Sequence, residues 1–519
     1  MAKRFQRADV RLVSEFGPVG ESLPLGEETP FVIGILGDFT GRPVYDKAGT
    51  PIALADRRPT EIDRDNFDAV MGRLDVRFEA SLDISSGPEG EGRSVQLLMR
   101  GIESFHPDEI LKQVEPLRAL LDVRRALEDP AKFDAAAAEI QKWIIPPDVA
   151  PTSPPSNRPS NLLDAILEGT DTSTAAMPRK DWSEDLERFV QEIVSPHLIR
   201  IDVRHQQQLI AAVERALSEQ VRTILHHSEF QRLEAAWRSL YFLVMNAETG
   251  AGLKIYLLNV SKAELETDLT NSLSVEESGL FKNLSAFSSE SGGQPWSALI
   301  ANYDFSMKLE DVDLLDRIAQ IAHNLRAPFI AAAGPPFFGS DSFASLPSAK
   351  TLARLFEEEQ YDAWRTFRKS PQARSVGLLL PRFLLRLPYG TQSDPISSFA
   401  FEEGVSGKDH DKYVWGNPAF AFAVILAREF AESGWLLNPA RLAGRLEGMP
   451  LHIYEEGGIA ETRPCAEVLL SDEVISSLES EGFMPLVSYR DRDFVVVHCS
   501  QSIASPPAIL AGRWSRIPS

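Results

Sequence analysis

A proline-rich segment divides this chain into two unequal units. The stretch IIPPDVAPTSPPSNRPSN carries six prolines between Pro146 and Pro159, with serine, threonine and asparagine among them. Proline fixes its own φ angle and lacks an N–H donor, so this stretch can complete neither a helix nor a strand ladder. We therefore predict a first unit over residues 1–145, a semi-rigid extended linker over 146–160 and a larger unit after it.

The composition restricts the possible function classes. Hydrophobic residues make up 43% of the chain and charged residues 25%, which is ordinary globular usage. The net charge is −22 and no basic face is segregated, so we expect no nucleic-acid binding. The two cysteines, Cys465 and Cys499, have no metal-binding spacing, and no stretch approaches the ~18 apolar residues of a membrane span. We expect a cytoplasmic protein without membrane insertion, metal or cofactor.

The first unit has the pattern of an α+β domain. The stretch VRFEASLDI alternates apolar and polar residues from Val76 onward, and RSVQLLM follows it as the partner strand of a hairpin. FVIGILGDF predicts a short buried strand, and Asp63 is a candidate N-cap for a helix that buries Phe67. One amphipathic helix is predicted from Pro107 through Leu121. A lone strand, ADVRLVSEFG, can pair within its own sheet or with a neighbour's.

The second unit begins with helices and continues as an α/β fold. Apolar residues recur at three- and four-residue steps in NLLDAILEG and from Leu209 to Ile224, which predicts a helical region over 161–250. Strands alternate with helices over 251–519, which predicts an α/β core with helices layered on a sheet. The predicted strands are LKIYLLNV, WSALIANYDF, APFIAAAG, SVGLLLP, PLHIYE, AEVLLS and FVVVHCS.

Two adjacent histidines, His226 and His227 in the stretch ILHHSEF, lie in the last turn of a predicted long helix. Ser228 and Gln231 have the spacing of a capping box for the next helix. Adjacent helical residues point about 100° apart, whereas metal-binding helices place their ligands four residues apart. We therefore interpret the stretch as a structural corner between two helices, not as a metal or catalytic site.

Catalytic motifs are nearly absent from the sequence. GVSGKDH does not match a phosphate-binding loop, and no G-x-S-x-G nucleophile elbow occurs. His498 and Cys499 are neighbours in a predicted strand and face opposite sides, which leaves a Cys/His hydrolase as a remote alternative. The acidic residues Glu402 and Glu403, together with the cluster 409–411, are predicted to lie in a solvated loop. We expect a protein that is not an enzyme.

Two arginines stand out in the stretch PRFLLRLPYG. Arg382 and Arg386 lie four residues apart among leucines, and no phosphate-binding motif explains them. Arginines placed in this way either close internal ion pairs or contact another subunit. The residues alone leave both alternatives open.

Several stretches, taken in chain order, give the sequence a family resemblance. ILHHSEFQRLEAAWRSLYFLV, APFIAAAGPPFFG, VGLLLPRFLLRLPYG, YVWGNPAFAFA and AEVLLSDEVISSLESEGFMPLV resemble the large subunit of the contractile type VI secretion sheath, TssC or VipB. VIGILGDFTGRP, EIDRDNFDAVM and GIESFHPDEILKQVEPLRALLDVRRAL are similar to motifs of the small subunit, TssB or VipA. The chain therefore resembles a natural fusion of the two subunits, with layered sheets and amphipathic helices.

The resemblance implies a structural protein that assembles with copies of itself or with other sheath subunits. Such subunits surround a tube of Hcp-like rings, meet baseplate components and contract to propel the tube. In this family strands from the chain termini cross to neighbouring subunits, which would make Val10 and Leu12 part of an inter-subunit strand. A helix recognised by the AAA+ unfoldase ClpV corresponds here to Leu162, Leu163, Ile166 and Leu167. The alternative reading of those four residues is a docked core helix.

The sequence departs from the family pattern in two respects. The two subunits are normally separate chains, whereas here the proline-rich linker joins them. After FVVVHCSQSI the family continues into a further C-terminal region, so we expect a large-subunit region that is truncated at its C-terminus. A non-polymerising adaptor or regulator of the sheath or baseplate therefore remains an alternative function.

Overall fold

The computed structural model describes residues 29–45, 49–82, 93–144, 206–290, 294–439 and 442–514, together with Val190 and Val194. Three predicted features lie outside these residues. They are the inter-subunit strand with Val10 and Leu12, the proline-rich linker, and the candidate unfoldase-recognition helix with Leu162, Leu163, Ile166 and Leu167. Among the described helices, none is long and apolar enough to cross a membrane.

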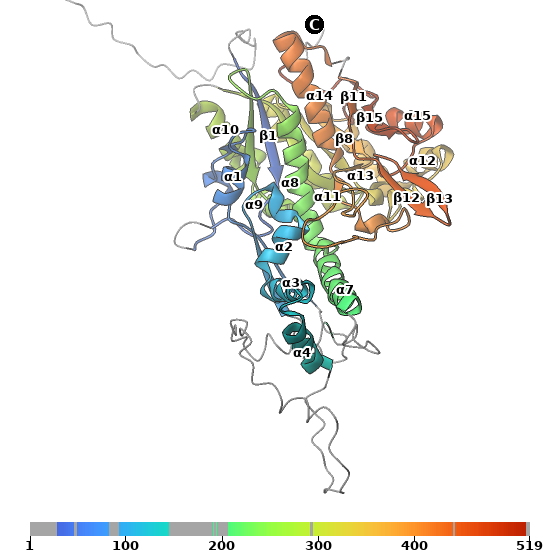
Figure 1. Ribbon diagram of the computed structural model, residues 1–519. Coiled ribbons are helices and arrows are strands. Elements are labelled where there is room, and N and C mark those ends of the chain that lie inside the picture. Colours follow the sequence, from blue (N-terminus) through green and yellow to red (C-terminus); the bar gives the residue numbers. More distant parts are fainter. Residues whose placement is uncertain are drawn as a thin grey trace, which may run out of the picture.

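A sheet of nine strands forms the centre of the molecule, in the order β11-β15-β14-β8-β7-β6-β1-β5-β2 (Figure 1). Its strands are β1 (Phe31–Gly37), β2 (Thr60–Glu61), β5 (Leu253–Asn259), β6 (Trp296–Phe305), β7 (Phe329–Ala333), β8 (Val376–Leu380), β11 (Gly444–Glu447), β14 (Phe483–Ser488) and β15 (Phe494–Val497). The six inner strands from β5 to β14 run parallel, and β2, β15 and β11 are antiparallel to their neighbours. The structure thus has mixed helices and strands around a large, mostly parallel sheet.

Strand β1 lies inside this sheet, between β5 and β6, although it comes from the first part of the chain. Phe31 pairs with Leu253 and Gly37 with Asn259 in parallel register. Every residue of β1 is buried, which is typical of a central parallel strand covered on both faces. The predicted strand FVIGILGDF is therefore confirmed, and its partners come from a region more than 200 residues away.

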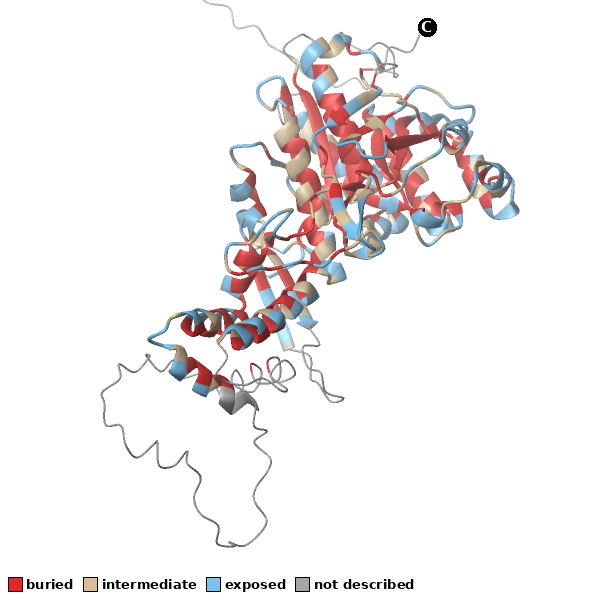
Figure 2. Ribbon diagram, turned by 45° about the vertical axis from the view of Figure 1, so that its right-hand side comes forward, coloured by how far each residue is buried: buried red, intermediate tan, exposed pale blue. Residues whose placement is uncertain are grey.

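Helices cover both faces of the sheet (Figure 2). The side chains of β1 alternate between the two cores that lie on these faces. Phe31, Ile33 and Ile35 belong to one core, and Val32 and Leu36 to the other. The first core includes helices α7 (Gln206–Leu225), α8 (Ser228–Asn246) and α14 (Pro418–Ser433). The second includes α9 (Lys262–Asn271), α10 (Gly279–Glu290), α11 (Leu309–Leu325), α12 (Ala349–Leu355), α13 (Asp362–Arg368) and α15 (Asp472–Ser480).

The remaining elements of the first part of the chain pack on the same core as α7 and α8. They are α1 (Phe67–Arg73), β3 (Val76–Leu82), β4 (Arg93–Met99), α2 (Pro107–Gln113), α3 (Glu115–Glu128) and α4 (Phe133–Ile144). The predicted hairpin is confirmed, because β3 and β4 pair along seven residues as a separate two-stranded sheet. Figure 1 shows α2, α3 and α4 beside α7 at the end of the molecule away from the C-terminus.

Two local predictions in this part were wrong. The helix predicted from Pro107 through Leu121 is broken at Val114, because Pro116 has no N–H to continue the ladder. Asp63 does not cap α1, which begins at Phe67. Instead, Asp63 Oδ1 accepts bonds of 2.9 Å from the backbone N–H groups of Asp65 and Asn66, forming a turn before the helix.

Two short two-stranded sheets lie outside the large sheet. They are β9 (Phe383–Leu384) with β10 (Trp415–Gly416), and β12 (His452–Glu456) with β13 (Ile459–Arg463). The predicted strand AEVLLS does not form. It makes a single bridge, between Ala466 and Phe383, because Glu467 turns inward to pair with Arg382. The short 3-10 helices are Leu54–Asp56, Ile102–Phe105, Val275–Glu277, Pro335–Phe338, Phe343–Ser345, Glu359–Tyr361, Pro371–Ser375, His410–Lys412 and Gly434–Leu436.

Candidate functional site

The two parts of the chain meet where the turn after β1 packs against α8 and β5. Trp237 Nε1 on α8 donates a 2.7 Å hydrogen bond to the backbone oxygen of Phe39. The amide of Phe39 donates to Asn259 Oδ1 at 2.7 Å, and Asn259 Nδ2 donates to Thr40 Oγ1 at 2.9 Å. All four residues are buried, so these bonds hold the turn in place without competition from water.

Aromatic side chains extend this contact between the two parts of the chain, which we call the joint, along α8. Phe67 of α1 lies edge-on to Trp237, with ring centroids 5.6 Å apart, and also to Tyr241. Phe78 of β3 and Phe105 both contact Phe230, at centroid distances of 5.4 and 5.6 Å. Edge-to-face contacts of this kind contribute beyond the burial of their area. One face of α8 is therefore built to receive the first part of the chain.

Polar contacts reinforce the joint farther from the sheet. Arg124 Nε on α3 lies 2.7 Å from Glu214 Oε1 on α7. Asp108 on α2 accepts hydrogen bonds from the backbone N–H groups and hydroxyls of Ser397 and Ser398. Burial raises the pKa of Asp108, but these bonds outweigh it and the net pKa is lowered. The carboxylate therefore stays ionised while it holds two distant segments together.

The adjacent histidines occupy the corner between α7 and α8. His227 is the N-cap of α8, because its Nδ1 accepts from the amide of Glu229 at 3.3 Å. The predicted cap, Ser228, is instead the first residue of the helix. His226 Nε2 lies 3.3 Å from Glu403 Oε1. The two imidazole rings thus contact different groups. In the described part of the chain, no three metal-ligating side chains lie close enough together to hold a metal ion.

Arg386 lies at the centre of a buried ion-pair network. Its Nε donates to Glu234 Oε1 on α8 at 2.8 Å, and its Nη1 donates to Glu403 Oε2 at 2.8 Å. Glu403 Oε2 also accepts from the amide of Tyr389 at 2.8 Å, and Arg238 Nε lies 2.6 Å from Glu234 Oε1. Both carboxylates are almost fully buried, so each depends on these cations for its charge.

Glu403 corrects the prediction of a solvated acidic loop. Burial raises its pKa, but Arg386, the nearby His226 and the hydrogen bond from the Tyr389 amide outweigh that effect and hold the pKa at about 2. Its neighbour Glu402 is exposed and accepts from Thr391, as a loop residue would. Adjacent residues of an extended chain face opposite sides, so one of these two neighbouring acids faces the core.

Arg382 closes a second network beside the β12–β13 hairpin. Its Nε and Nη2 donate to the two oxygens of Glu467, each at 2.7 Å. His410 Nε2 lies 2.6 Å from Glu467 Oε1. Burial raises the pKa of Glu467, but Arg382 and His410 outweigh it and hold the pKa at about 2. Of the two alternatives for the arginines, the structure realises internal ion pairs for both.

The hydrolase alternative finds no support in the geometry of Cys499 and His498. Burial, followed by the nearby Glu479 carboxylate, raises the pKa of the Cys499 thiol to about 12. His498 Nδ1 lies 3.7 Å from Glu479 Oε1. A thiol nucleophile requires a lowered pKa and a histidine directed at the sulfur. Here the pKa of the thiol is raised and the imidazole lies beside Glu479.

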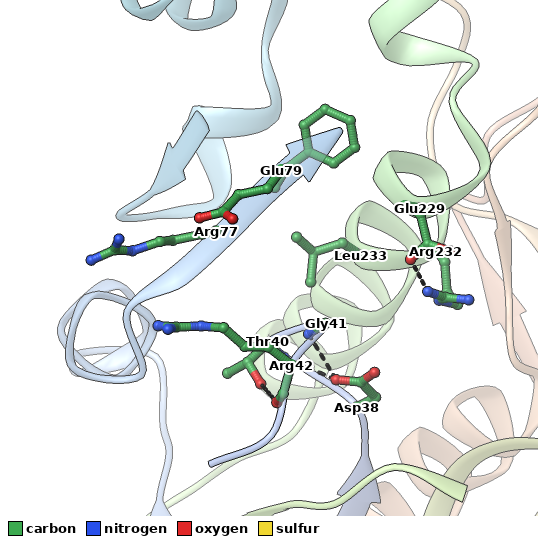
Figure 3. Close-up of a pocket in the computed structure, with 10 residues that line it drawn as sticks. Asp38, Thr40, Gly41, Arg42, Arg77, Glu79, Glu229, Arg232 and Leu233 are labelled. Carbon is green, nitrogen blue, oxygen red and sulfur yellow. Dashed lines mark hydrogen bonds and ion pairs between the residues drawn. The ribbon is translucent and has the colours of Figure 1, made fainter. Parts of the chain in front are cut away.

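A small hollow of about 110 Å³ opens where the two parts of the chain meet (Figure 3). Its walls are the turn Asp38–Arg42, strand β3 with Arg77 and Glu79, and helix α8 with Glu229, Arg232 and Leu233. The charged groups already have partners. Arg232 pairs with Glu229, and Asp38 Oδ1 accepts from the amide of Gly41 at 2.8 Å. The hollow is far smaller than a typical ligand pocket of ~300–1,000 Å³, so we assign it no substrate.

Sequence reasoning missed the residues that carry the joint. No role was predicted from the sequence for Trp237, Asn259 or Glu234. The burial of Glu234 could have been predicted from the sequence, because Glu234 lies between Phe230 and Trp237 on the buried stripe of α8. A carboxylate at such a position requires a buried cation.

Both parts of the chain match models of known protein families. The sequence model described as "EvpB/VC_A0108, tail sheath N-terminal domain" matches residues 207–504, more than half of the chain. The chain belongs to this tail sheath family. A second model, "Type VI secretion system, VipA, VC_A0107 or Hcp2", matches residues 16–142. The two matched regions lie on either side of the proline-rich segment.

Two proteins of Pseudomonas aeruginosa are similar to the two regions of this sheath-family chain. The chain is 38% identical to type VI secretion system sheath protein TssC1 over 311 residues, 59% of this chain and 62% of TssC1. It is 33% identical to type VI secretion system sheath protein TssB1 over 101 residues, 19% of this chain and 55% of TssB1. The chain therefore spans less than two thirds of the length of each relative. Regions similar to two separate proteins here form one fold.

Proposed function

We propose that this chain is a structural subunit of a contractile type VI secretion sheath. One observation carries the proposal: strand β1 of the TssB-like region lies between β5 and β6 of the TssC-like region. The two regions therefore share one sheet and one core, and each chain supplies one region of each kind in a fixed one-to-one ratio. In this proposal the subunits surround an Hcp-like tube, attach to baseplate components in the cytoplasm and contract to propel the tube.

The interior is suited to transmitting force. The Arg386 network and the Arg382 network fix the segment after β8 to α8 and to the residues before α15. Buried ion-pair networks in which each carboxylate has its cation permit few alternative packings, so the subunit would move as one body. The energy for contraction would then lie in contacts between subunits. The geometry of Cys499 and His498 gives no support to a catalytic role.

Three further proposals concern segments outside the described residues. We propose that Val10 and Leu12 belong to a strand that crosses to a neighbouring subunit and pairs with its sheet. The helix containing Leu162, Leu163, Ile166 and Leu167 is the proposed recognition element for a ClpV-like unfoldase. Residues 146–160 are the proposed linker between the two regions.

Electron microscopy of the purified chain, alone and with its Hcp-like tube protein, tests the function. The expected result is tubules whose number rises when the tube protein is present. A variant lacking residues 1–17 serves as the matched control, because it should remain folded and form no tubules. Isolated particles in every condition, with the tube or baseplate protein bound to them, would instead favour the adaptor.

A further inference from the structure

The β12–β13 hairpin stands apart from the large sheet, yet it is held firmly at its base. An isolated two-stranded hairpin is at best marginally stable in water, so its neighbours must support it. Tyr413 Oη lies 2.8 Å from His452 Nδ1, and Arg463 Nη2 lies 2.7 Å from His410 Nδ1. Arg463 also lies over the rings of Tyr413 and Trp415. At the tip, Gly457 and Gly458 have φ angles of 61° and 81°, which suits a tight two-residue turn.

This supported hairpin presents apolar and acidic side chains to solvent. Ile453 and Glu455 share one face of β12, opposite Thr462 and Ala460 of β13. The side chain of Ile453 is 65% exposed, and Glu455 and Ala460 are exposed beside it. A large exposed apolar side chain on a rigid projection is typical of a contact surface. We call Ile453, Glu455 and Ala460 the hairpin face.

A group of arginines that has no carboxylate partner among the described residues lies at the other end of the sheet. Arg326 precedes β7 and Arg374 precedes β8, so both lie at the N-terminal ends of parallel strands. The segment before Trp514 ties them together. The amide of Arg513 donates to the Arg326 oxygen at 3.0 Å, and the amide of Ala511 donates to the Arg374 oxygen at 2.7 Å. We call Arg326, Arg374 and Arg513 the arginine patch.

The arginine patch is unusual in a chain with a net charge of −22. Within the described part of the chain, no carboxylate lies at ion-pair distance from any of its three side chains. Arg513 Nε is buried without a hydrogen-bond partner, and the side chains of Arg326 and Arg374 are exposed. Burial and the nearby Arg326 cation lower the pKa of Arg513. Ile509, 52% exposed, lies beside the patch in the chain and offers it an apolar neighbour.

The two surfaces lie at opposite ends of the parallel strands. The hairpin is tied to the segment after the C-terminal end of β8, through the bonds from Glu467 N to Arg382 O and from Leu384 N to Cys465 O. The arginine patch lies before the N-terminal end of β8. A hairpin therefore cannot reach the patch of its own chain. A contact between unlike surfaces repeats from copy to copy, and it continues as a filament unless the rotation between copies closes a ring.

We infer that the acidic, isoleucine-bearing hairpin face of one copy docks on the arginine patch of the next copy. The carboxylate of Glu455 supplies the anion that the arginines lack, and Ile453 packs near Ile509. Complementary charge would set the partner and the register, while the apolar contact excludes water. This inference rests on the proposed sheath function only for the presence of repeated copies. It places one stacking contact along the strand direction of the sheet.

Two complementary variants test the contact without requiring tubules. Variant A carries Ile453→Ser and Glu455→Gln, which removes the hairpin face and leaves the patch. Variant B carries Arg326→Asn and Arg374→Gln, which removes the patch and leaves the hairpin. Asparagine suits position 326, where φ is 53°. In a mixture only one contact is possible, between the hairpin of B and the patch of A, and the complex cannot extend.

Sedimentation velocity of A, B and the mixture at low salt gives the result. We expect a one-to-one complex in the mixture. Its dissociation constant should be at least tenfold lower than that for self-association of either variant, and added salt should raise it. A mixture that sediments as two separate monomers would overturn the docking, whether or not the unchanged chain self-associates. The docking would likewise be overturned if the unchanged chain bound a nucleic acid or another polyanion, B did not, and the mixture of A and B formed no complex.

Matched controls separate the contact from changes in folding or net charge. Glu357→Gln with Glu359→Gln removes two exposed acids from another surface, and Arg490→Gln removes an exposed arginine from the β14–β15 turn. Both should self-associate like the unchanged chain, and thermal unfolding should show A and B to be folded. A complex between A and B without tubules from the unchanged chain would refute the sheath function alone. Tubules formed normally by both A and B would refute the docking alone.

Discussion

Trp237 Nε1 and the backbone oxygen of Phe39, 198 residues apart in sequence, are joined by a 2.7 Å hydrogen bond in the buried centre of the molecule. Phe39 follows β1 in the region that the VipA family model matches, and Trp237 belongs to α8 in the region that the tail sheath family model matches. This bond and the ring contact between the same two residues, with centroids 5.4 Å apart, make Trp237 a direct side-chain contact between the regions.

Replacing Trp237 should weaken the whole fold. Trp237→Phe removes the donor and leaves the Phe39 oxygen buried without a partner, so the free energy of unfolding should fall by about 1–3 kcal/mol. Trp237→Ala also removes a large buried side chain and should cost about 3–5 kcal/mol. Denaturant titration measures both, with the exposed Tyr489→Phe as control. An unchanged midpoint for Trp237→Ala would contradict the role given to this residue.

Cutting the chain between the two regions should not separate them. A specific protease site inserted between Pro154 and Pro155 allows cleavage after folding. Because β1 lies between β5 and β6, its removal would open the middle of the sheet. The two fragments should co-elute in size-exclusion chromatography and separate only in denaturant. Separation under native conditions would show that the regions are independent domains.

Removing the Arg386 cation alone should lower the free energy of unfolding more than removing it together with its carboxylate partner. Arg386→Leu leaves Glu234 and Glu403 buried without their principal cation and should cost about 3–5 kcal/mol. Replacing Arg386 and Glu403 together by leucine leaves no unpaired carboxylate there, because Glu234 keeps its ion pair with Arg238. The double variant should therefore be more stable than the single one. Thermal unfolding of the two variants compares them. A double variant less stable than Arg386→Leu would contradict the argument.

Stability should fall in acid because of two buried carboxylates. The pKa values of Glu403 and Glu467 are about 2 in the folded chain, below the ordinary 4.5. A group with a lowered folded pKa contributes its full stabilisation above its unfolded pKa and loses it as the pH falls toward the folded pKa. The loss should therefore occur between pH 4.5 and 2. Denaturant midpoints across this range should vary less with pH in Glu403→Gln, and an equal slope in both proteins would contradict the assignment.

The thiols should be inert in the folded chain. Burial is the main reason that the pKa of Cys465 and of Cys499 rises to about 12, so both stay protonated at neutral pH. Iodoacetamide at pH 8 should label neither cysteine until denaturant is added, as judged by mass spectrometry. Cys499→Ala should leave assembly unchanged. Rapid labelling of Cys499 in the native chain would reopen the hydrolase alternative.

Sequence periodicity predicted elements well but could not assign partners. The alternation beginning at Val76 and the all-apolar run beginning at Phe31 identified strands correctly. Nothing in the run FVIGILG specifies that it pairs with LKIYLLN, because main-chain ladders are the same for every apolar strand. The hairpin β3–β4 was easier, since its partners are close in sequence.

The buried charges show a second limit of the sequence. Glu402 and Glu403 are the same residue type and adjacent in sequence, yet Glu402 is exposed and Glu403 is only 1% exposed. Which of them turns inward depends on Arg386 and Tyr389, whose positions follow from the packing around α8. The position of Arg386 among leucines indicated that it needed a partner. It could not identify Glu234, 152 residues away.

Helical reconstruction by electron cryo-microscopy of the chain assembled around its tube protein tests the central claim most directly. The account predicts a repeating unit that contains one chain, with β1 between β5 and β6 of the same sheet. A repeat in which β1 pairs with another chain, or an absence of ordered assemblies in the presence of the tube protein, would contradict it.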